Sequence, residues 1–151
     1  MAESSITRAL AMDPRVANPK AVELHVNAGL FLRDAVSLRE NATAGQFVLF
    51  MHAIELALKS FLHLKGQSLK SLRLNCGHDL ELLLAEADRS GLLVPEADAE
   101  AVVSRLNKYT ERAAIRYDFS FTMPLVADVR RVAQSILKTT EPALPPVGAR
   151  R

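Results

Sequence analysis

The sequence has a single cysteine and no tryptophan. That cysteine, Cys76, excludes an internal disulfide and is typical of a protein from a reducing compartment. The N-terminal segment lacks the basic stretch and apolar core of a secretory signal. No apolar run approaches membrane-spanning length, because charged residues punctuate every predicted helix. We therefore expect a soluble, cytoplasmic protein with no membrane partner.

Several chemical signatures are missing as well. The chain has no glycine-rich phosphate loop, no cysteine pair at C-x-x-C spacing and no serine in a nucleophile-elbow context. Cys76 lies beside His78, but neighbours in a loop rarely form a nucleophile and its base. His52 and His63 are three helical turns apart, and only His52 with Glu55 has ligand-like spacing. We therefore expect no cofactor and no metal site.

The apolar content that is present suits one compact domain. The chain has 151 residues, of which 49% are hydrophobic, so it has enough material for one full core. Its net charge of +2 is too small to indicate a nucleic-acid binder without a local basic patch. We expect an N-terminal segment at 1–18, a helical domain at 19–140 and a flexible Pro/Arg tail at 141–151.

Apolar residues recur at helical spacing along this domain, with no strand pattern and no internal repeat. The predicted helices begin at Pro19, at 41–44, at 78–79, at 95–98 and at 122–124, and glycine or proline residues punctuate their ends. Residues 66–77 are predicted to be a loop, with a single turn at 69–72 as the alternative. The expected fold class is all-α, an up-and-down bundle of about five helices.

The central helix, at 46–65, is apolar almost all round yet carries one polar stripe. The stripe consists of His52, Glu55, Lys59 and His63. The positions predicted to be fully buried are Phe47, Ile54, Leu58 and Phe61. In one interpretation Glu55 and Lys59 form an i, i+4 ion pair, which contributes only about 0.3 to 0.5 kcal/mol when exposed. In the other, Glu55 points into a pocket between helices and positions a cationic or hydrogen-bonding group. Both interpretations stay open.

A second stripe, made of basic residues, lies on the fourth predicted helix. Its members are Arg105, Lys108, Arg112 and Arg116, beside Tyr109. Aligned cations repel one another unless an anion or an acidic surface lies opposite. The stripe ends at Arg116 and Tyr117, where a guanidinium and a phenol would suit a phosphate or a base. The alternative is a solvated face on which Glu111 offsets Lys108.

Three segments in order, HAIELALKSFLHLKG, GHDLELLLAEADRSG and LNKYTERAAIRYDF, resemble the signature of HEPN domains (higher eukaryotes and prokaryotes nucleotide-binding). The resemblance covers about residues 47–121. The matching positions are Glu55 and Lys59 on the second core helix, His78, Asp79 and Leu80 at the next helix, and Arg116 and Tyr117 at the end. It implies a helical bundle that is often dimeric.

The resemblance also bears on activity. HEPN ribonucleases share an Arg-x(4-6)-His motif near the end of a late helix, and in this chain no histidine follows Tyr109. Arg73 and His78 have that spacing, but they precede the third predicted helix, so we regard the match as coincidence. The chain looks closer to HEPN modules that bind a nucleotide or a partner beside a nucleotidyltransferase.

Three hypotheses result. The first is a noncatalytic HEPN-like module, a homodimer that binds a nucleotide, RNA or a protein partner, working beside a nucleotidyltransferase in a toxin-antitoxin-like system. Its ligand-binding residues would be Glu55, Lys59, Arg112, Arg116, Tyr117 and Tyr109, with weaker contributions from His52, His78 and Asp79. The second is a HEPN ribonuclease toxin with His78 or His52 as the base. The third is a structural subunit.

Overall fold

A computed structural model of the chain describes residues 18–108 and 124–142. These residues form six α-helices and no strand, so the prediction of an all-α bundle is confirmed. The helices are α2 (Pro19–Ser37), α3 (Ala44–Leu64), α4 (Leu69–Asn75), α5 (Leu80–Arg89), α6 (Ala99–Asn107) and α8 (Val126–Thr140).

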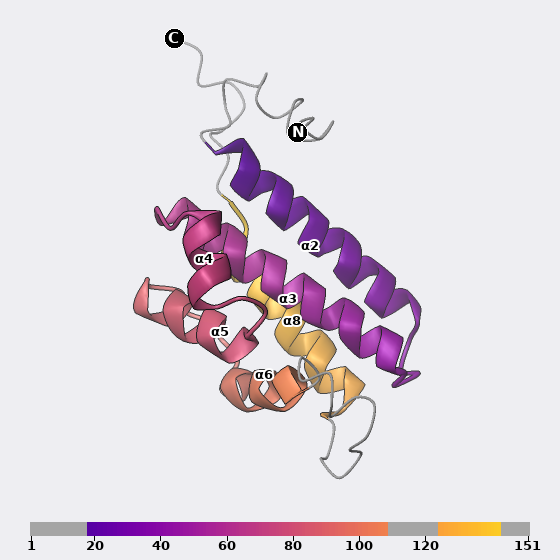
Figure 1. Ribbon diagram of the computed structural model, residues 1–151. Coiled ribbons are helices and arrows are strands. Elements are labelled where there is room, and N and C mark those ends of the chain that lie inside the picture. Colours follow the sequence, from indigo (N-terminus) through magenta and orange to yellow (C-terminus); the bar gives the residue numbers. More distant parts are fainter. Residues whose placement is uncertain (1–17, 109–123, 143–151) are drawn as a thin grey trace.

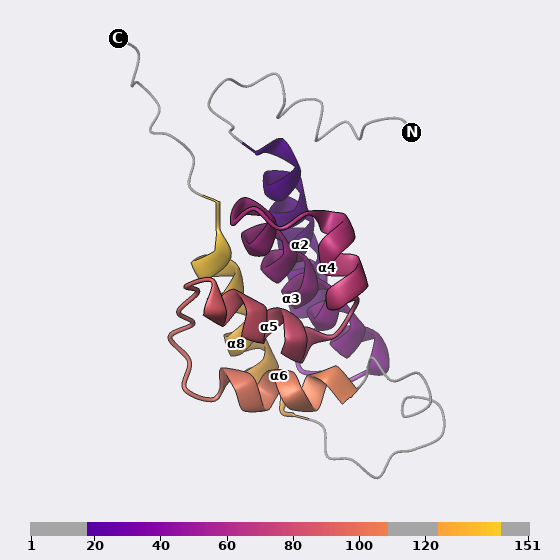
Figure 2. The ribbon, with the colours of Figure 1, turned by 60° about the vertical axis from the view of Figure 1, so that its left-hand side comes forward.

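The central helix of the bundle is α3. Helix α2 lies along one side of it, and α8 and α5 pack against other sides (Figure 1). Helix α6 packs on α5 and α8, on the side of α3 away from α2 (Figure 2). Because α3 contacts every other described helix, it sets the position of any side chain that projects between them.

The buried face of α3 follows the prediction except at one residue. Three of the four predicted core positions are buried, namely Phe47, Ile54 and Leu58. Phe61 is only partly buried, so its predicted full burial is wrong. The inward positions continue from Leu58 to Leu62, which leaves Phe61 at the edge of the core. There the Nζ atom of Lys65 lies 5.4 Å from the Phe61 ring centroid.

Helix α3 is also long and apolar enough to cross a bilayer, which corrects the expectation that no segment approaches that length. An 18-residue window within its 21 residues has a mean hydropathy of 1.5. Half of that window is buried inside the bundle. Length and composition alone fit both a core helix and a membrane span. The buried half of the window packs within the bundle, in which α2, α5 and α8 are the main neighbours of α3.

The turn between α2 and α3 is closed by one buried side chain, Gln46. Its Oε1 accepts a hydrogen bond from the Ala42 amide at 2.9 Å, and its Nε2 donates to the Ala35 carbonyl at 3.0 Å. The N-cap residue Thr43 accepts a bond from the Gln46 amide at 3.1 Å. Backbone groups on both sides of the turn are thereby satisfied, which fixes how α2 lies along α3.

Helix α4 corrects the prediction of a loop with at most one turn at 66–77. Ser68 caps it by accepting a hydrogen bond from the Ser71 amide at 3.0 Å, and Leu72 is buried. Gly66 and Gly77 flank the helix with φ values of +99° and +56°, a region that favours glycine. Seven residues are too few for hydrophobic periodicity to reveal a helix.

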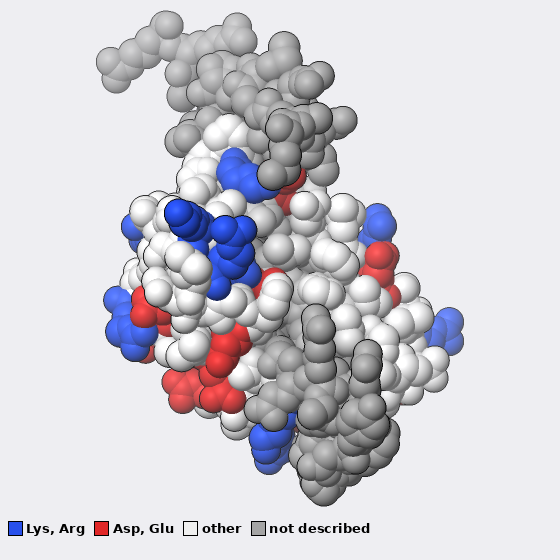
Figure 3. Space-filling view, viewed as in Figure 1, with Lys and Arg blue, Asp and Glu red and all other residues white. Residues whose placement is uncertain are grey.

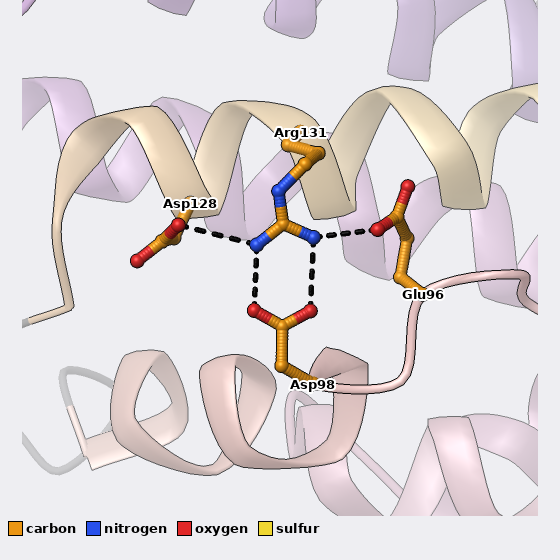
Figure 4. A network of polar contacts seen from close by, with 4 residues as sticks. All are labelled: Glu96, Asp98, Asp128 and Arg131. Atoms are coloured by element: carbon orange, nitrogen blue, oxygen red, sulfur yellow. Dashed lines mark hydrogen bonds and ion pairs between the residues drawn. The ribbon is translucent and has the colours of Figure 1, made fainter.

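An arginine on α8 ties that helix to the segment before α6 (Figure 4). The Arg131 guanidinium donates to both carboxylate oxygens of Asp98, at 2.9 and 2.6 Å. It also donates to Glu96 at 2.5 Å and to Asp128 at 3.1 Å. The hydrogen bonds from Arg131 hold the pKa of Asp98 below its ordinary value, and the carboxylates raise the pKa of Arg131. The network stays charged at neutral pH and fastens α8 to the segment between α5 and α6.

The burial of α3 predicts a large penalty for a charge at Ile54. Ile54 is fully buried, so Ile54→Asp would place an unpaired carboxylate in the core. We expect a loss of about 4 kcal/mol or more in the free energy of unfolding, measured by urea denaturation. Leu93→Asp is the matched control, because Leu93 is 81% exposed and its substitution should change stability little. An Ile54→Asp protein as stable as the Leu93→Asp control would contradict the assignment of α3 as the core helix.

The network around Arg131 predicts a pH dependence of stability. Because the folded pKa of Asp98 is depressed, its contribution is present above the unfolded pKa and is lost as the pH falls through the folded value. As the pH is lowered from about 5 to about 2, the melting temperature of Arg131→Met should therefore fall less than that of the parent. Arg130→Met is the control, because Arg130 makes one exposed contact, to Glu40 at 3.2 Å. Equal pH slopes for the parent and Arg131→Met would show that the network contributes nothing.

Candidate functional site

The candidate site is built on Glu55, a carboxylate in the middle of an otherwise apolar helix. Glu55 Oε1 lies 2.6 Å from Nδ1 of His78, in the loop between α4 and α5. Its Oε2 lies 3.6 Å from Nζ of Lys59, one turn further along α3. We call Glu55, Lys59 and His78 the polar cluster. The structure thus brings together three residues from two separate predicted elements.

The exposure of the three side chains differs sharply. The side chains of Glu55 and Lys59 are 10% and 14% exposed, whereas that of His78 is 79% exposed. A carboxylate only accepts hydrogen bonds, so His78 Nδ1 donates to it. This leaves Nε2 of the exposed imidazole free for a ligand. A protonated ring would donate to an anion from that atom, and a neutral ring would accept a proton there.

A second pair of contacts joins the same loop to α6. Asp79 is the N-cap of α5 and accepts a hydrogen bond from the Leu82 amide at 3.1 Å. Asn107, at the end of α6, donates from Nδ2 to Asp79 Oδ1 at 3.0 Å. Its Oδ1 accepts from the Leu80 amide at 2.8 Å. Glu55 therefore holds the loop through His78, and Asn107 holds it through Asp79 and Leu80.

The two histidines of the predicted stripe on α3 do not join the polar cluster. The His52 ring packs against Phe31 of α2, with ring centroids 5.1 Å apart. His63 Nδ1 lies 2.9 Å from the carbonyl oxygen of Gln67. Glu55 and Lys59 do form the i, i+4 ion pair of the first interpretation, and Glu55 also contacts His78 in the loop before α5. The pocket of the second interpretation stays a prediction. Two of the four stripe residues thus belong to the polar cluster.

The basic stripe is described only at its start. Arg105 on α6 and Lys108 directly after α6 are exposed. The remaining predicted site residues, Tyr109, Arg112, Arg116 and Tyr117, lie outside the described residues. Asn107 was missing from the predicted site. Its only signal in the sequence is its place at the start of the third HEPN-like segment, and an asparagine near a helix end is too common to identify a contact.

On the face shown in Figure 3, Lys and Arg side chains gather over α4. Asp and Glu side chains lie over α5 and α6, with further basic side chains at the edges of that region (Figure 3). Helix α4 carries Lys70 and Arg73, both exposed, and it leads directly into the loop with His78. The loop therefore follows a locally basic helix, although the net charge of the whole chain is small.

The described residues offer little for metal or thiol chemistry. Within 18–108 and 124–142, no group of three or more His, Cys, Asp or Glu side chains could hold a metal ion. Cys76 is buried at the end of α4. Burial raises the pKa of its thiol, and the carboxylates of Glu86 and Asp79 raise it further. A protonated, buried thiol is a poor nucleophile.

Comparison with known proteins identifies no relative. No family model matches the chain, and no curated protein or solved structure matches it.

Proposed function

We propose that this protein is a noncatalytic HEPN-like module that binds a nucleotide or RNA through phosphate contacts at the polar cluster. The observation that carries the proposal is the convergence of Lys59 and His78 on the buried carboxylate of Glu55. Glu55 orients both groups, while the imidazole stays exposed to an incoming ligand. An ammonium and a protonated imidazole held in this way would donate charge-assisted hydrogen bonds to phosphate oxygens.

Two further features support an anionic ligand. The exposed Lys70 and Arg73 extend the positive charge along α4 toward the cluster. On the other side, Asn107 holds the end of α6 against the loop, and the basic stripe continues in the sequence from Lys108. We propose that Arg112 and Arg116 complete the phosphate contacts and that Tyr109 and Tyr117 stack on a base.

The assembly and location belong to the same proposal. The HEPN resemblance favours a cytoplasmic homodimer that works beside a nucleotidyltransferase partner in a toxin-antitoxin-like system. The exposed side chains of Val26 and Leu30, one turn apart on α2, offer apolar surface for such a contact. Light scattering of the purified protein at micromolar concentration measures the oligomeric state, and a monomer would count against the dimer.

The binding proposal predicts a specific loss in the double variant Lys59→Ala/His78→Ala. Each removed charge-assisted contact is worth about 1.5 kcal/mol or more, so affinity for ATP or a short RNA should fall about 100-fold. Fluorescence anisotropy with labelled ligands measures this loss, and circular dichroism verifies the helical content. Arg112→Ala/Arg116→Ala should weaken binding as well, and binding by the parent should fall steeply with salt.

The matched control is Lys138→Ala/His63→Ala. It removes the same residue types from α8 and from the end of α3, where His63 contacts the carbonyl oxygen of Gln67. Its affinity should equal that of the parent. If both double variants bind as the parent does, or if both lose affinity equally, the polar cluster is not the ligand site.

A ribonuclease toxin is the second candidate, and one observation favours it. A buried carboxylate that orients an exposed imidazole is the arrangement of a general base and its orienting group. Such a base would take the proton of a ribose 2′-hydroxyl at His78 Nε2. The sequence lacks the late histidine of HEPN ribonucleases, so we place this candidate second. If neither candidate binds or cleaves, the hypothesis of a structural subunit remains.

The noncatalytic proposal predicts that the purified protein cleaves no RNA. A fluorogenic RNA substrate without added metal measures the activity directly. His78→Ala is the diagnostic variant, because its exposed side chain contributes little to the core. Reproducible cleavage by the parent that disappears in His78→Ala would replace the binding module by the ribonuclease toxin.

A further inference from the structure

Asn107 touches the loop of the polar cluster without belonging to the cluster. We infer that Asn107 is a positioning residue, which fixes the imidazole of His78 relative to the end of α6. The inference rests on the proposed function, because it assigns Asn107 to that same site. It adds a residue on a third element to the two that carry the polar cluster.

The side-chain amide of Asn107 offers the turn an acceptor and a donor, and the turn uses both. Asp79, as the N-cap, accepts a bond from the Leu82 amide, but an N-cap side chain does not reach the first amide of its helix. That first amide belongs to Leu80, which is 1% exposed and so shielded from water. Asn107 Oδ1 provides the acceptor at 2.8 Å. The same amide group donates from Nδ2 to Asp79 at 3.0 Å, so both ends of the side chain are used.

The turn is therefore held from two sides. On one side Glu55 of α3 accepts the hydrogen bond of His78 at 2.6 Å. On the other side Asn107 of α6 holds Asp79 and Leu80, the two residues that follow His78. Since His78 is mostly exposed, packing does little to fix its ring. Its direction depends on its bond to Glu55 and on the backbone of the turn, which Asn107 fixes.

Asn107 lies between Arg105 and Lys108, the two described members of the basic stripe. It is the last residue of α6, and the exposed Lys108 follows it directly. The bond to Asp79 therefore joins the loop with His78 to the end of α6, where these two cations lie. A ligand that contacts His78 and these cations would depend on this bond even though it touches neither Asn107 nor Asp79.

The test uses the donor and acceptor pattern of Asp79 and Asn107. Asn107→Asp keeps an acceptor for the Leu80 amide but places a like charge beside Asp79. In Asp79→Asn/Asn107→Asp, the amide at 79 donates to the carboxylate at 107, and asparagine still caps the Leu82 amide. The NMR signals of the His78 imidazole, followed over pH, report its surroundings, and a fluorescent ATP analogue reports binding.

We expect Asn107→Asp to change the chemical shifts of the His78 imidazole and to weaken binding of the ATP analogue at least about tenfold, which is 1.4 kcal/mol. The exchanged pair should restore both values toward the parent. Arg131→Met is the control, because it breaks contacts of α8 with the segment before α6 and should leave the His78 signals unchanged. A purely structural role for Asn107 predicts lower stability in Asn107→Asp with unchanged His78 signals, and that result would overturn the inference.

The two proposals fail in different ways. If the parent does not bind the ATP analogue or a short RNA, the proposed function fails, while the NMR comparison still decides the role of Asn107. If Asn107→Asp does not fold, Asn107→Ala removes both bonds without adding charge, and it should shift the same His78 signals. Failure of the exchanged pair to restore the chemical shifts of the His78 imidazole would also overturn the inference.

Discussion

Removal of α3 from water is the constraint on which the rest of the bundle depends. Its fully buried Phe, Ile and Leu side chains each contribute about 1.5 to 3 kcal/mol when they leave water. No single neighbour covers a helix that is apolar on most sides, so α2, α8 and α5 pack around it. The order of these helices around α3 then decides which loops meet and which polar side chains come together.

Glu55 is a buried carboxylate on this mostly apolar helix, and it links stability to the candidate site. A buried carboxylate destabilises a protein unless cations or donors satisfy it. Lys59 is available on the same helix, but its Nζ lies 3.6 Å from Glu55, whereas the His78 nitrogen lies at 2.6 Å. The closer partner comes from the loop before α5, so satisfying Glu55 also places that loop. Substitution of Glu55 would therefore affect folding and the site together, whereas His78 can be removed with less cost to the core.

Much of the fold could be predicted from the sequence because its signals are local. Pro19, Thr43 and Asp79 act at helix starts, and the spacing of Ile54 and Leu58 identifies an inward face. The candidate site was only half predictable for the same reason. The i, i+4 spacing of Glu55 and Lys59 predicted their pairing as one of two interpretations, and the structure contains the pair. The contacts of Glu55 with His78 and of Asp79 with Asn107 join residues far apart in the chain, so only the packing of α5 against α3 and α6 creates them.

The two polar networks of the bundle differ in whether they leave a side-chain nitrogen unused. At Arg131, three carboxylates accept hydrogen bonds from the two terminal nitrogens of one guanidinium. Both nitrogens are occupied, and the network joins α8 to the segment before α6. At the polar cluster, the buried carboxylate uses only one nitrogen of an imidazole that is 79% exposed. The ring is held because the buried carboxylate of Glu55 needs a donor, and this bond leaves the other ring nitrogen unused. An oriented side chain with an unused nitrogen is what the proposed recognition of a ligand would require, since the ordering of the group precedes binding.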